Sequence, residues 1–283
     1  MDETGFSLKD AKIAMIGLGL MGGSLALSLR HNCQRLSALD TNLSTLELAR
    51  VQKIVDVADS DPDKVLADAD LVILACPIPA IIEWINRLQD YIHHPCIVMD
   101  IGSTKRGIVK ALETLPANFD PIGGHAICGR EHLSLKNAEP ALFHQAPFAL
   151  TPLARTSSNA RNAALQILEV LGANPLWCNA NDHDRILANT SHMPYLLSSA
   201  LALIPTEEAI PFIGSGFRST ARLAGTPSSM MLGVLLSNHD NILTALRQIQ
   251  GQLSQLESAL ENDPTGLQAI LDRAQDQYHT LMQ

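Results

Sequence analysis

Short apolar runs alternate with stretches of helical spacing through the first 178 residues of the chain. Residues 71–76 and 96–101 are runs with few polar interruptions, which are typical of parallel strands covered on both faces. Residues 20–29, 81–88 and 159–171 show helical spacing instead. Further strands are expected at residues 13–16, 34–40, 120–125, 148–151 and 175–178. This alternation predicts the α/β class, with a doubly wound parallel sheet.

After residue 178 the strand patterns end and only helical spacing remains. Helices are expected at residues 182–204, 213–224, 229–261 and 266–282, with Asp182 as the cap of the first. We therefore divide the chain into an α/β domain of residues 1–178 and an all-helical domain of residues 179–283. The predicted helix 229–261 repeats Leu, Ile and Met along one face for many turns. Such a face indicates burial in a homodimer.

A glycine pattern joins the first predicted strand to the first predicted helix. Gly17, Gly19 and Gly22 fit G-x-G-x-x-G, which lets a backbone approach a pyrophosphate at a helix N-terminus. The alternative, a tight turn without a ligand, is weaker between a strand and a helix. This is the Rossmann-type fingerprint. We expect two strand ends to bind the cofactor, through Gly17, Leu18, Gly19, Leu20, Met21, Gly22, Cys76 and Pro77.

Asp40 extends this fingerprint. It ends the second predicted strand, 18 residues after Gly22, close to the usual spacing of about 20 for the acid that binds the adenosine ribose. A carboxylate there repels a 2′-phosphate, so NAD is expected and NADP is less favoured. The alternative is that Asp40 caps the next helix, although Asn42 or Ser44 could cap it equally well.

Composition and charge limit the class of protein. The 283 residues carry a net charge of −9, which argues against a nucleic-acid partner. No apolar run is long enough to span a membrane, and the acidic first residues do not read as a signal peptide. The five cysteines are scattered, with no spacing typical of a metal site, which indicates reduced thiols. We expect a cytoplasmic protein without a metal.

His125 and Ser103 both follow predicted strands, where doubly wound sheets bind their ligands. Removal of a hydride from an alcohol carbon needs a base for the hydroxyl proton, and histidine suits that task near neutral pH. His125 follows Gly123 and Gly124, which allow close approach of a ligand, although a single histidine after a strand is more often structural. Ser103 could cap the next helix, or it could hold a substrate hydroxyl or the nicotinamide amide.

Two further pairs lie in the helical domain. His183 and His192 are nine residues apart, about 180° around a regular helix, so we expect only His192 to line a pocket unless Pro194 distorts the helix. Arg218 and Arg222 lie at i and i+4, where their charges repel each other. A bound carboxylate would explain this pair, and a solvated basic face is the alternative.

Taken in order, these motifs resemble the prephenate/arogenate dehydrogenase family of tyrosine biosynthesis. The segments are GLGLMGGSL at 17–25, DIGSTK at 100–105, GGHAICG at 123–129, APFALTP at 146–152, DHD at 182–184, SHMP at 191–194 and GFRSTAR at 216–222. The resemblance covers nearly the whole chain. It implies an oxidoreductase that uses NAD for oxidative decarboxylation of prephenate to 4-hydroxyphenylpyruvate, or of arogenate to tyrosine.

The resemblance also implies roles for the candidate residues. His125 would accept the hydroxyl proton of the substrate, and Ser103 would orient that hydroxyl. Arg222 would hold a substrate carboxylate, with Arg218 and His192 in support. The family commonly has a proline directly after the histidine, where this chain has Ala126. We expect this loss to loosen the loop that holds the histidine. Ser219 stands where the family often has an acid.

Two other functions fit part of this pattern. The 3-hydroxyacid dehydrogenases share the pattern at residues 17–22, but they rely on a lysine in the helical domain. This chain has no lysine after Lys136. A non-catalytic NAD-binding or sensing protein would not need His125, Ser103 and the arginine pair together.

Overall fold

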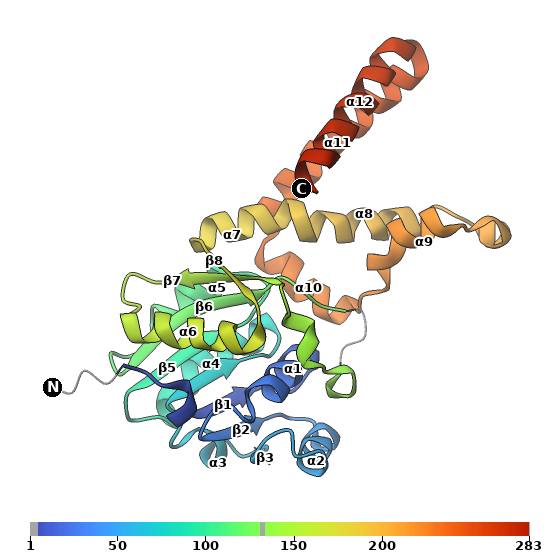
Figure 1. The fold of residues 1–283 in the computed structure, drawn as a ribbon. Helices are drawn as coiled ribbons and strands as arrows, with labels where there is room; N and C mark the ends of the chain where they lie inside the picture. Colours follow the sequence, from blue (N-terminus) through green and yellow to red (C-terminus); the bar gives the residue numbers. More distant parts are fainter. Residues whose placement is uncertain (1–4, 131–133, 283) are drawn as a thin grey trace.

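The N-terminal domain is built on one eight-stranded sheet, shown in a computed structural model that describes residues 5–130 and 134–282 (Figure 1). The acidic residues 1–4 lie outside the described part. The strand order is β3-β2-β1-β4-β5-β6-β7-β8. The strands are β1 (Lys12–Ile16), β2 (Arg35–Leu39), β3 (Val57–Asp59), β4 (Leu71–Leu74), β5 (Cys96–Asp100), β6 (Phe119–Ala126), β7 (Pro147–Pro152) and β8 (Asn174–Trp177).

The order of the strands reverses at β1, which pairs in parallel with both β2 and β4. Ligands bind at such a switch point, outside the carboxyl ends of the strands. Strand β7 departs from the expected parallel sheet because it runs antiparallel to β6. Parallel pairing needs a long crossover, whereas the described chain between β6 and β7 holds only short 3₁₀ turns. The three-residue strand β3 was not predicted, since it is too short to show a pattern.

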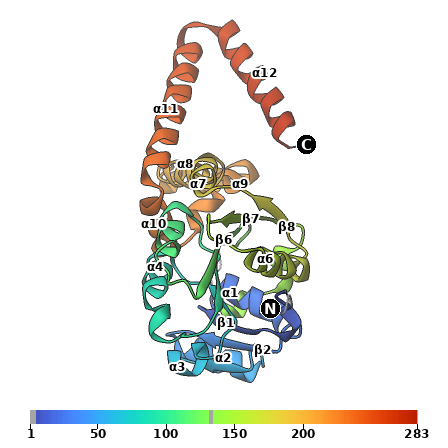
Figure 2. The same ribbon diagram turned by 90° about the vertical axis from the view of Figure 1, so that its left-hand side faces the viewer.

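Helices cover both faces of the sheet (Figure 2). Apolar side chains of α1 (Leu20–Leu29), α2 (Leu43–Val51) and α6 (Ser158–Leu171) form one core with the sheet. Those of α3 (Pro62–Leu66), α4 (Ile78–Arg87) and α5 (Arg106–Leu112) form a second core on the opposite face. Helix α6 ends where expected, at Gly172, whose φ of +63° is the left-handed conformation that closes many helices.

The helical domain differs from its prediction in two places. The expected helix 182–204 is α7 (Ala180–Leu187), a π-helical turn (Ala188–His192) and α8 (Met193–Ala202), and its cap is Asn179 rather than Asp182. The expected helix 229–261 is two helices, α10 (Ser228–Ser237) and α11 (His239–Asn262), which are separated at Asn238. Helices α9 (Ser215–Ala221) and α12 (Pro264–Leu281) complete the domain.

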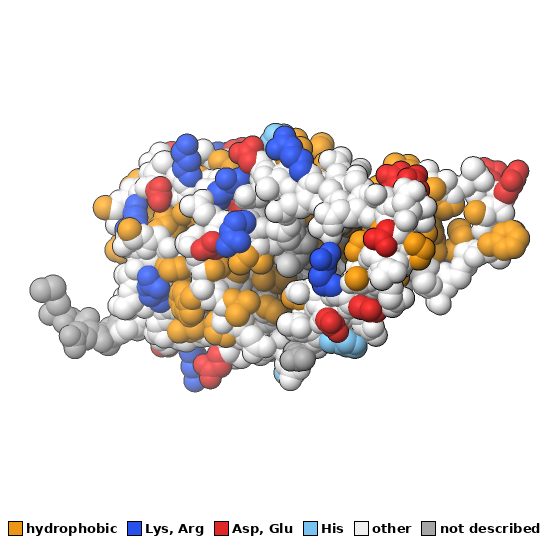
Figure 3. All heavy atoms as spheres, turned by 90° about the horizontal axis from the view of Figure 1, so that it is seen from above, with side chains coloured by type: hydrophobic (Ala, Val, Ile, Leu, Met, Phe, Trp, Pro, Cys, Tyr) orange, Lys and Arg blue, Asp and Glu red, His pale blue; other side chains and the backbone are white. Residues whose placement is uncertain are grey.

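Helices α11 and α12 extend away from the rest of the molecule (Figures 1 and 2). Among its described residues, the core cluster within this domain consists of Ala188, Met193, Ile242 and Ala245, while Met231 and Val234 of α10 pack into the second core of the sheet. Large apolar side chains remain exposed in the single chain, and many gather on the projecting end near α8 and α9 (Figure 3). The exposed apolar side chains include Leu203, Ile204, Ile210 and Phe212 between α8 and α9, and Leu253, Leu260, Leu271 and Leu281 on α11 and α12. Over the described residues, no helix combines the length and apolar character needed to cross a membrane.

Candidate active site

A cavity of about 410 Å³ lies between the two domains. Ser103 and His125 line it from the carboxyl edge of the sheet, and His192 and Arg222 line it from the helical domain. The structure therefore brings together four of the five predicted catalytic and substrate-binding residues. Arg218 is exposed and is not among the described residues that line this cavity.

The glycine loop after β1 has the shape that a dinucleotide requires. Gly17 has a φ of +99°, and a Cβ there would lie 2.7 Å from the Ala75 carbonyl oxygen. A Cβ on Gly22 would lie 2.0 Å from the Gly17 oxygen, so α1 packs directly against the loop. A Cβ on Gly19 would meet no described atom within 4 Å. Open space therefore faces the backbone where a pyrophosphate would approach the start of α1.

Asp40 turns its carboxylate toward this loop. It accepts hydrogen bonds from the backbone N–H groups of Leu18 and Asn42, each at 2.8 Å. Asn42 caps α2, because its side chain accepts from the N–H groups of Ser44 and Thr45. The capping alternative for Asp40 is therefore wrong. The carboxylate lies at the end of β2, beside the loop, where the adenosine ribose of a dinucleotide is bound in such folds.

The other predicted cofactor residues surround the same loop. The side chains of Leu18 and Leu20 are buried in the core, so only their backbone can face a ligand. Met21 and Cys76 are half-buried, and a Cβ on Gly17 would lie 3.2 Å from that of Cys76. Pro77 is exposed just before α4. Burial raises the pKa of the Cys76 thiol to about 12, so the group is a neutral neighbour of the loop.

His125 lies within β6, where it pairs with Ala149 of β7. Ala126 continues the strand and pairs with Phe148. The expectation that His125 sits in a loop loosened by the missing proline is therefore wrong. The sheet itself holds the backbone of the histidine, and Gly124 permits the close packing, since a Cβ there would lie 2.6 Å from the Asp100 carbonyl oxygen.

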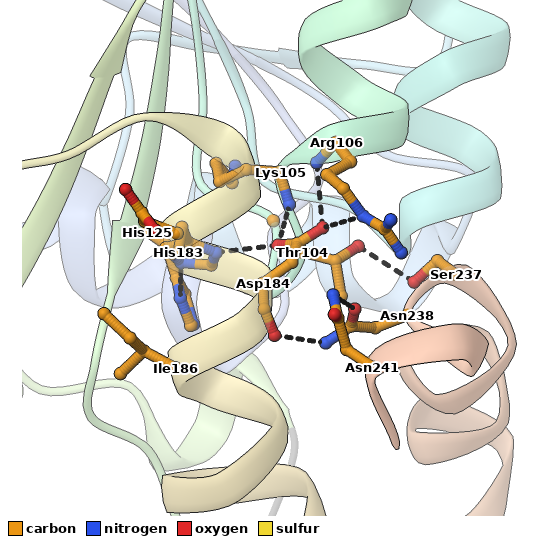
Figure 4. A network of polar contacts seen from close by, with 12 residues as sticks. Thr104, Lys105, Arg106, His125, His183, Asp184, Ile186, Ser237, Asn238 and Asn241 are labelled. Atoms are coloured by element: carbon orange, nitrogen blue, oxygen red, sulfur yellow. Dashed lines mark hydrogen bonds and ion pairs between the residues drawn. The ribbon is translucent and has the colours of Figure 1, made fainter. Parts of the chain in front are cut away.

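A line of three side chains orients the His125 ring (Figure 4). Nδ1 of His125 lies 2.9 Å from Nε2 of His183, and Nδ1 of His183 lies 2.8 Å from Oδ1 of Asp184. The carboxylate can only accept, so His183 carries a proton on Nδ1. A His183 ring with this single proton accepts at Nε2 from the Nδ1–H of His125. This order leaves the lone pair of His125 on Nε2, the ring nitrogen that does not contact His183.

Burial controls the charges in this line. Burial chiefly, and nearby His183 in addition, lowers the pKa of His125 well below 6.5. The pKa of His192 is lowered to about 4, again mainly by burial. Burial raises the pKa of Asp184, but hydrogen bonds from His183 and from the backbone N–H groups of Arg106 and Lys105 outweigh this effect and lower the pKa overall. Near neutral pH, the Asp184 carboxylate is therefore ionised, and the rings of His125 and His192 are neutral.

Asp184 also joins the two domains. Its carboxylate accepts from the backbone N–H groups of Lys105 at 2.7 Å and Arg106 at 2.9 Å, at the start of α5. This geometry satisfies N–H groups that have no partner within the helix. The capping alternative for Ser103 is therefore wrong, since the residue precedes α5 and lines the cavity. The buried Lys105 side chain donates to Asp100 and to the Gly124 carbonyl oxygen, next to His125.

The π-helical turn explains how both helical-domain histidines become buried. His183 and His192 are each only 1% exposed. A π turn holds more residues than an α turn, so it changes the direction of His192 relative to His183. Of the two, only His192 is among the described residues that line the cavity, as expected, and His183 lies between His125 and Asp184. The roles of His183, Asp184 and Lys105 were not predicted from the sequence. The available signals were Pro194, which indicates a distorted helix, and the DHD motif, which places an acid next to a histidine.

A metal site is not part of this arrangement. Within residues 5–130 and 134–282, no group of three or more His, Cys, Asp or Glu side chains could hold a metal ion. The five cysteines all lie in these ranges and are free thiols. The donor set at the cavity instead consists of imidazole nitrogens, a hydroxyl and a guanidinium, which suit proton transfer and anion binding.

Fold and site together define a dinucleotide-dependent dehydrogenase with its substrate cavity between a doubly wound domain and a helical domain. The family model described as prephenate dehydrogenase, nucleotide-binding domain, matches residues 25–176. The model described as prephenate dehydrogenase, dimerization domain, matches residues 179–273. The chain belongs to the prephenate dehydrogenase family.

Individual relatives agree with this membership. Prephenate dehydrogenase of Bacillus subtilis is 27% identical over 267 residues, which cover 90% of this chain and 71% of that protein. The crystal structure of Synechocystis arogenate dehydrogenase is 29% identical, with a TM-score of 0.81 over 95% of this chain and 99% of that one. Prephenate dehydrogenase of A. aeolicus, in complex with hydroxyphenyl propionate and NAD⁺, is 25% identical, with a TM-score of 0.89 over 98% and 100%. The expected family and fold class are confirmed.

Proposed function

We propose that this enzyme catalyses the NAD-dependent oxidative decarboxylation of prephenate, of arogenate or of both. The observation that carries the proposal is the His125–His183–Asp184 line, which ends in the same cavity as Arg222. Support comes from the relatives, which are a prephenate dehydrogenase, an arogenate dehydrogenase and a structure bound to hydroxyphenyl propionate and NAD⁺. That bound aromatic acid has a phenolic hydroxyl and a side-chain carboxylate, as the proposed products have.

The residues of the cavity divide the reaction between them. Nε2 of His125 takes the proton of the ring hydroxyl, and Ser103 orients that hydroxyl toward it. Bound NAD would supply the acceptor for the hydride of the hydroxyl-bearing carbon. The bond to the ring carboxylate then breaks, carbon dioxide leaves, and its electron pair completes the aromatic ring. Arg222 binds a carboxylate of the substrate, with His192 as a neutral hydrogen-bonding neighbour. Arg218 supports carboxylate binding through its charge alone, unless the second chain of a dimer brings its side chain closer to the cavity.

The loop from Gly17 to Gly22 and Asp40 would hold the dinucleotide. The positive end of α1 and the space over Gly19 suit the pyrophosphate. Asp40 would bind the adenosine ribose hydroxyls, which favours NAD over NADP. Cys76 and Pro77 would close the site from the end of β4.

We further propose a homodimer formed through residues 179–283, in the cytoplasm. The match to a dimerization domain and the exposed apolar side chains of α11 and α12 support it. Sedimentation at micromolar concentration should give twice the mass of the chain. Leu253→Glu, on the exposed face of α11, should shift the protein toward monomer, whereas a wild-type monomer would contradict the proposal.

The substrate assay follows NADH formation with prephenate and with arogenate, side by side, using NAD and then NADP. Turnover of at least one substrate with NAD, with release of carbon dioxide equal to the NADH formed, is the expected result. A series of 3-hydroxyacids serves as the control for the other dehydrogenase class. Turnover of a 3-hydroxyacid without turnover of either cyclohexadienol would overturn the proposal.

A further inference from the structure

The break between α10 and α11 places a buried amide beside His192. The apolar pattern continues across residues 229–261, yet the chain leaves the helix at Asn238, where φ is −120° and ψ is 25°. The Asn238 side chain is fully buried. Its Nδ2 lies 3.2 Å from Nδ1 of His192. The same Nδ2 lies 2.6 Å from the Asp184 carbonyl oxygen, and Oδ1 accepts from Asn241 at 2.8 Å (Figure 4).

These contacts determine which way the amide faces. A backbone carbonyl oxygen can only accept, so the Asn238 group beside Asp184 must be the NH₂. One of its protons goes to Asp184 and the other points to Nδ1 of His192. That ring nitrogen must therefore carry the lone pair. A neutral imidazole then has its single proton on Nε2.

The charge state of His192 agrees with this picture. Burial, the main cause, lowers its pKa to about 4, so the ring is neutral near pH 7. The ring lines the cavity together with Arg222 and Ser103. Asn238 occupies Nδ1, which leaves Nε2–H as the polar group that the ring can offer to a ligand.

We propose that Asn238 is a positioning residue that fixes the tautomer of His192, so that His192 presents an Nε2–H donor to a substrate oxygen in the cavity. The substrate part of this inference rests on the proposed function, whereas the tautomer does not. The acceptor is a carboxylate or keto oxygen of the cyclohexadienol side chain or ring. Arg222 supplies the charge, and His192 supplies a directed neutral hydrogen bond.

Asp184 thereby sets opposite tautomers for the two histidines of the cavity. Its side chain acts through His183 and leaves His125 with a lone pair on Nε2. Its backbone carbonyl acts through Asn238 and leaves His192 with a proton on Nε2. His125 is thus a proton acceptor and His192 a hydrogen-bond donor in the same cavity. Hydrogen bonds set this difference, and both rings are neutral.

The first test is nitrogen-15 NMR of the whole protein with labelled histidine, recorded without substrate near pH 7. The wild-type His192 ring, assigned by comparison with His192→Gln, should show a protonated Nε2 and an unprotonated Nδ1. A His192 ring that is mainly protonated on Nδ1 overturns the inference. The measurement needs no Asn238 variant and no turnover, so its failure is separate from a failure of the proposed function.

The second test compares Asn238→Ala with Asn241→Ala, which removes the hydrogen bond on the opposite side of the same amide. Asn238→Ala should mix the two tautomers and raise KM for the substrate several-fold to about tenfold, the size of one hydrogen bond. Asn241→Ala should leave the tautomer and KM near wild type. Equal changes in both variants would assign Asn238 a structural role only.

His192→Gln completes the design, because an amide can donate from the position of Nε2 without help from Asn238. In this background, Asn238→Ala should raise KM by much less than it does in the wild type. A full additive rise in KM would contradict the tautomer role. The dissociation constant of NAD serves as the folding control. It should be the same for the wild type, Asn238→Ala, His192→Gln and the double variant.

Discussion

The two domains of this chain differ in how they reach a stable core. The N-terminal domain packs helices on both faces of its sheet and buries two large apolar clusters. Over its described residues, the helical domain has a core cluster of four residues of its own and exposes apolar side chains along α11 and α12. A helix pair with this little internal packing gains stability from another surface. The first domain is complete within one chain, whereas the second is built for a partner.

The same contrast runs through the chemistry. At the carboxyl edge of the sheet, strand pairing holds the backbone of His125, and Ser103 lies in the segment between β5 and α5. The helical domain contributes His192, Arg222 and the carboxylate of Asp184, all on helices or turns. We therefore expect changes on the sheet side to affect the chemical step. Changes of His192 or Arg222 on the helical side should affect substrate binding, whereas His183 and Asp184 act on the chemical step through His125.

The largest expected effect comes from His125→Asn. Asparagine can keep the hydrogen bond to His183 but cannot accept the hydroxyl proton, so kcat should fall by about 10²–10⁴-fold. Initial rates of NADH formation measure this loss, and the dissociation constant of NAD should stay nearly unchanged. Turnover close to that of the wild type would remove His125 from the role of base.

Arg222→Ala tests the helical side of the comparison. Loss of a charged hydrogen bond to a carboxylate should raise KM for the substrate by about 10–100-fold, with a much smaller effect on NAD binding. Arg218→Ala is the matched control, because Arg218 is exposed and lies outside the lining of the cavity. An unchanged KM in Arg222→Ala would reject its role. An equal rise in both variants would show that the arginines act as a pair.

The contrast between the domains also explains what the sequence could predict. Strands of the first domain are covered on both faces, so their apolar runs alone locate β1, β4 and β5 within one or two residues. The glycine pattern and Asp40 need only local geometry, and both lie as expected at the ends of β1 and β2. The antiparallel direction of β7 depends on how the chain returns to the sheet, which apolar periodicity does not encode.

In the helical domain, periodicity predicted helices but not their interruptions. The π turn and the break at Asn238 both occur where buried polar groups find partners in another element. Such partners are distant in sequence, as Asn238 is from Asp184, so no local sequence pattern predicts the interruptions. The roles of His183 and Asp184 were missed for the same reason. Their meaning depends on the contact with His125 and α5 across the domain boundary.

The buried histidines at this boundary should make stability depend on pH. Below about pH 6.5, His192 of the unfolded chain binds a proton, whereas folded His192 stays neutral until about pH 4. The unfolded state then binds more protons, so stability falls as the pH drops from about 6.5 toward 4, by about 1.4 kcal/mol per pH unit for this group. Urea unfolding of His192→Gln at fixed protein concentration should show a shallower fall. Parallel curves for variant and wild type would exclude this contribution.

The smallest expected effect concerns the coenzyme, on the side of the sheet alone. Asp40→Ser removes the charge that repels a 2′-phosphate, so the ratio of kcat/KM for NAD to that for NADP should fall several-fold, with the substrate KM unchanged. Asn42→Ala is the control, since it weakens the cap of α2 beside Asp40 without changing that charge. An unchanged ratio in Asp40→Ser would leave Asp40 with only its local hydrogen bonds to Leu18 and Asn42. A change confined to this ratio would locate coenzyme choice in the N-terminal domain and substrate choice in the helical one.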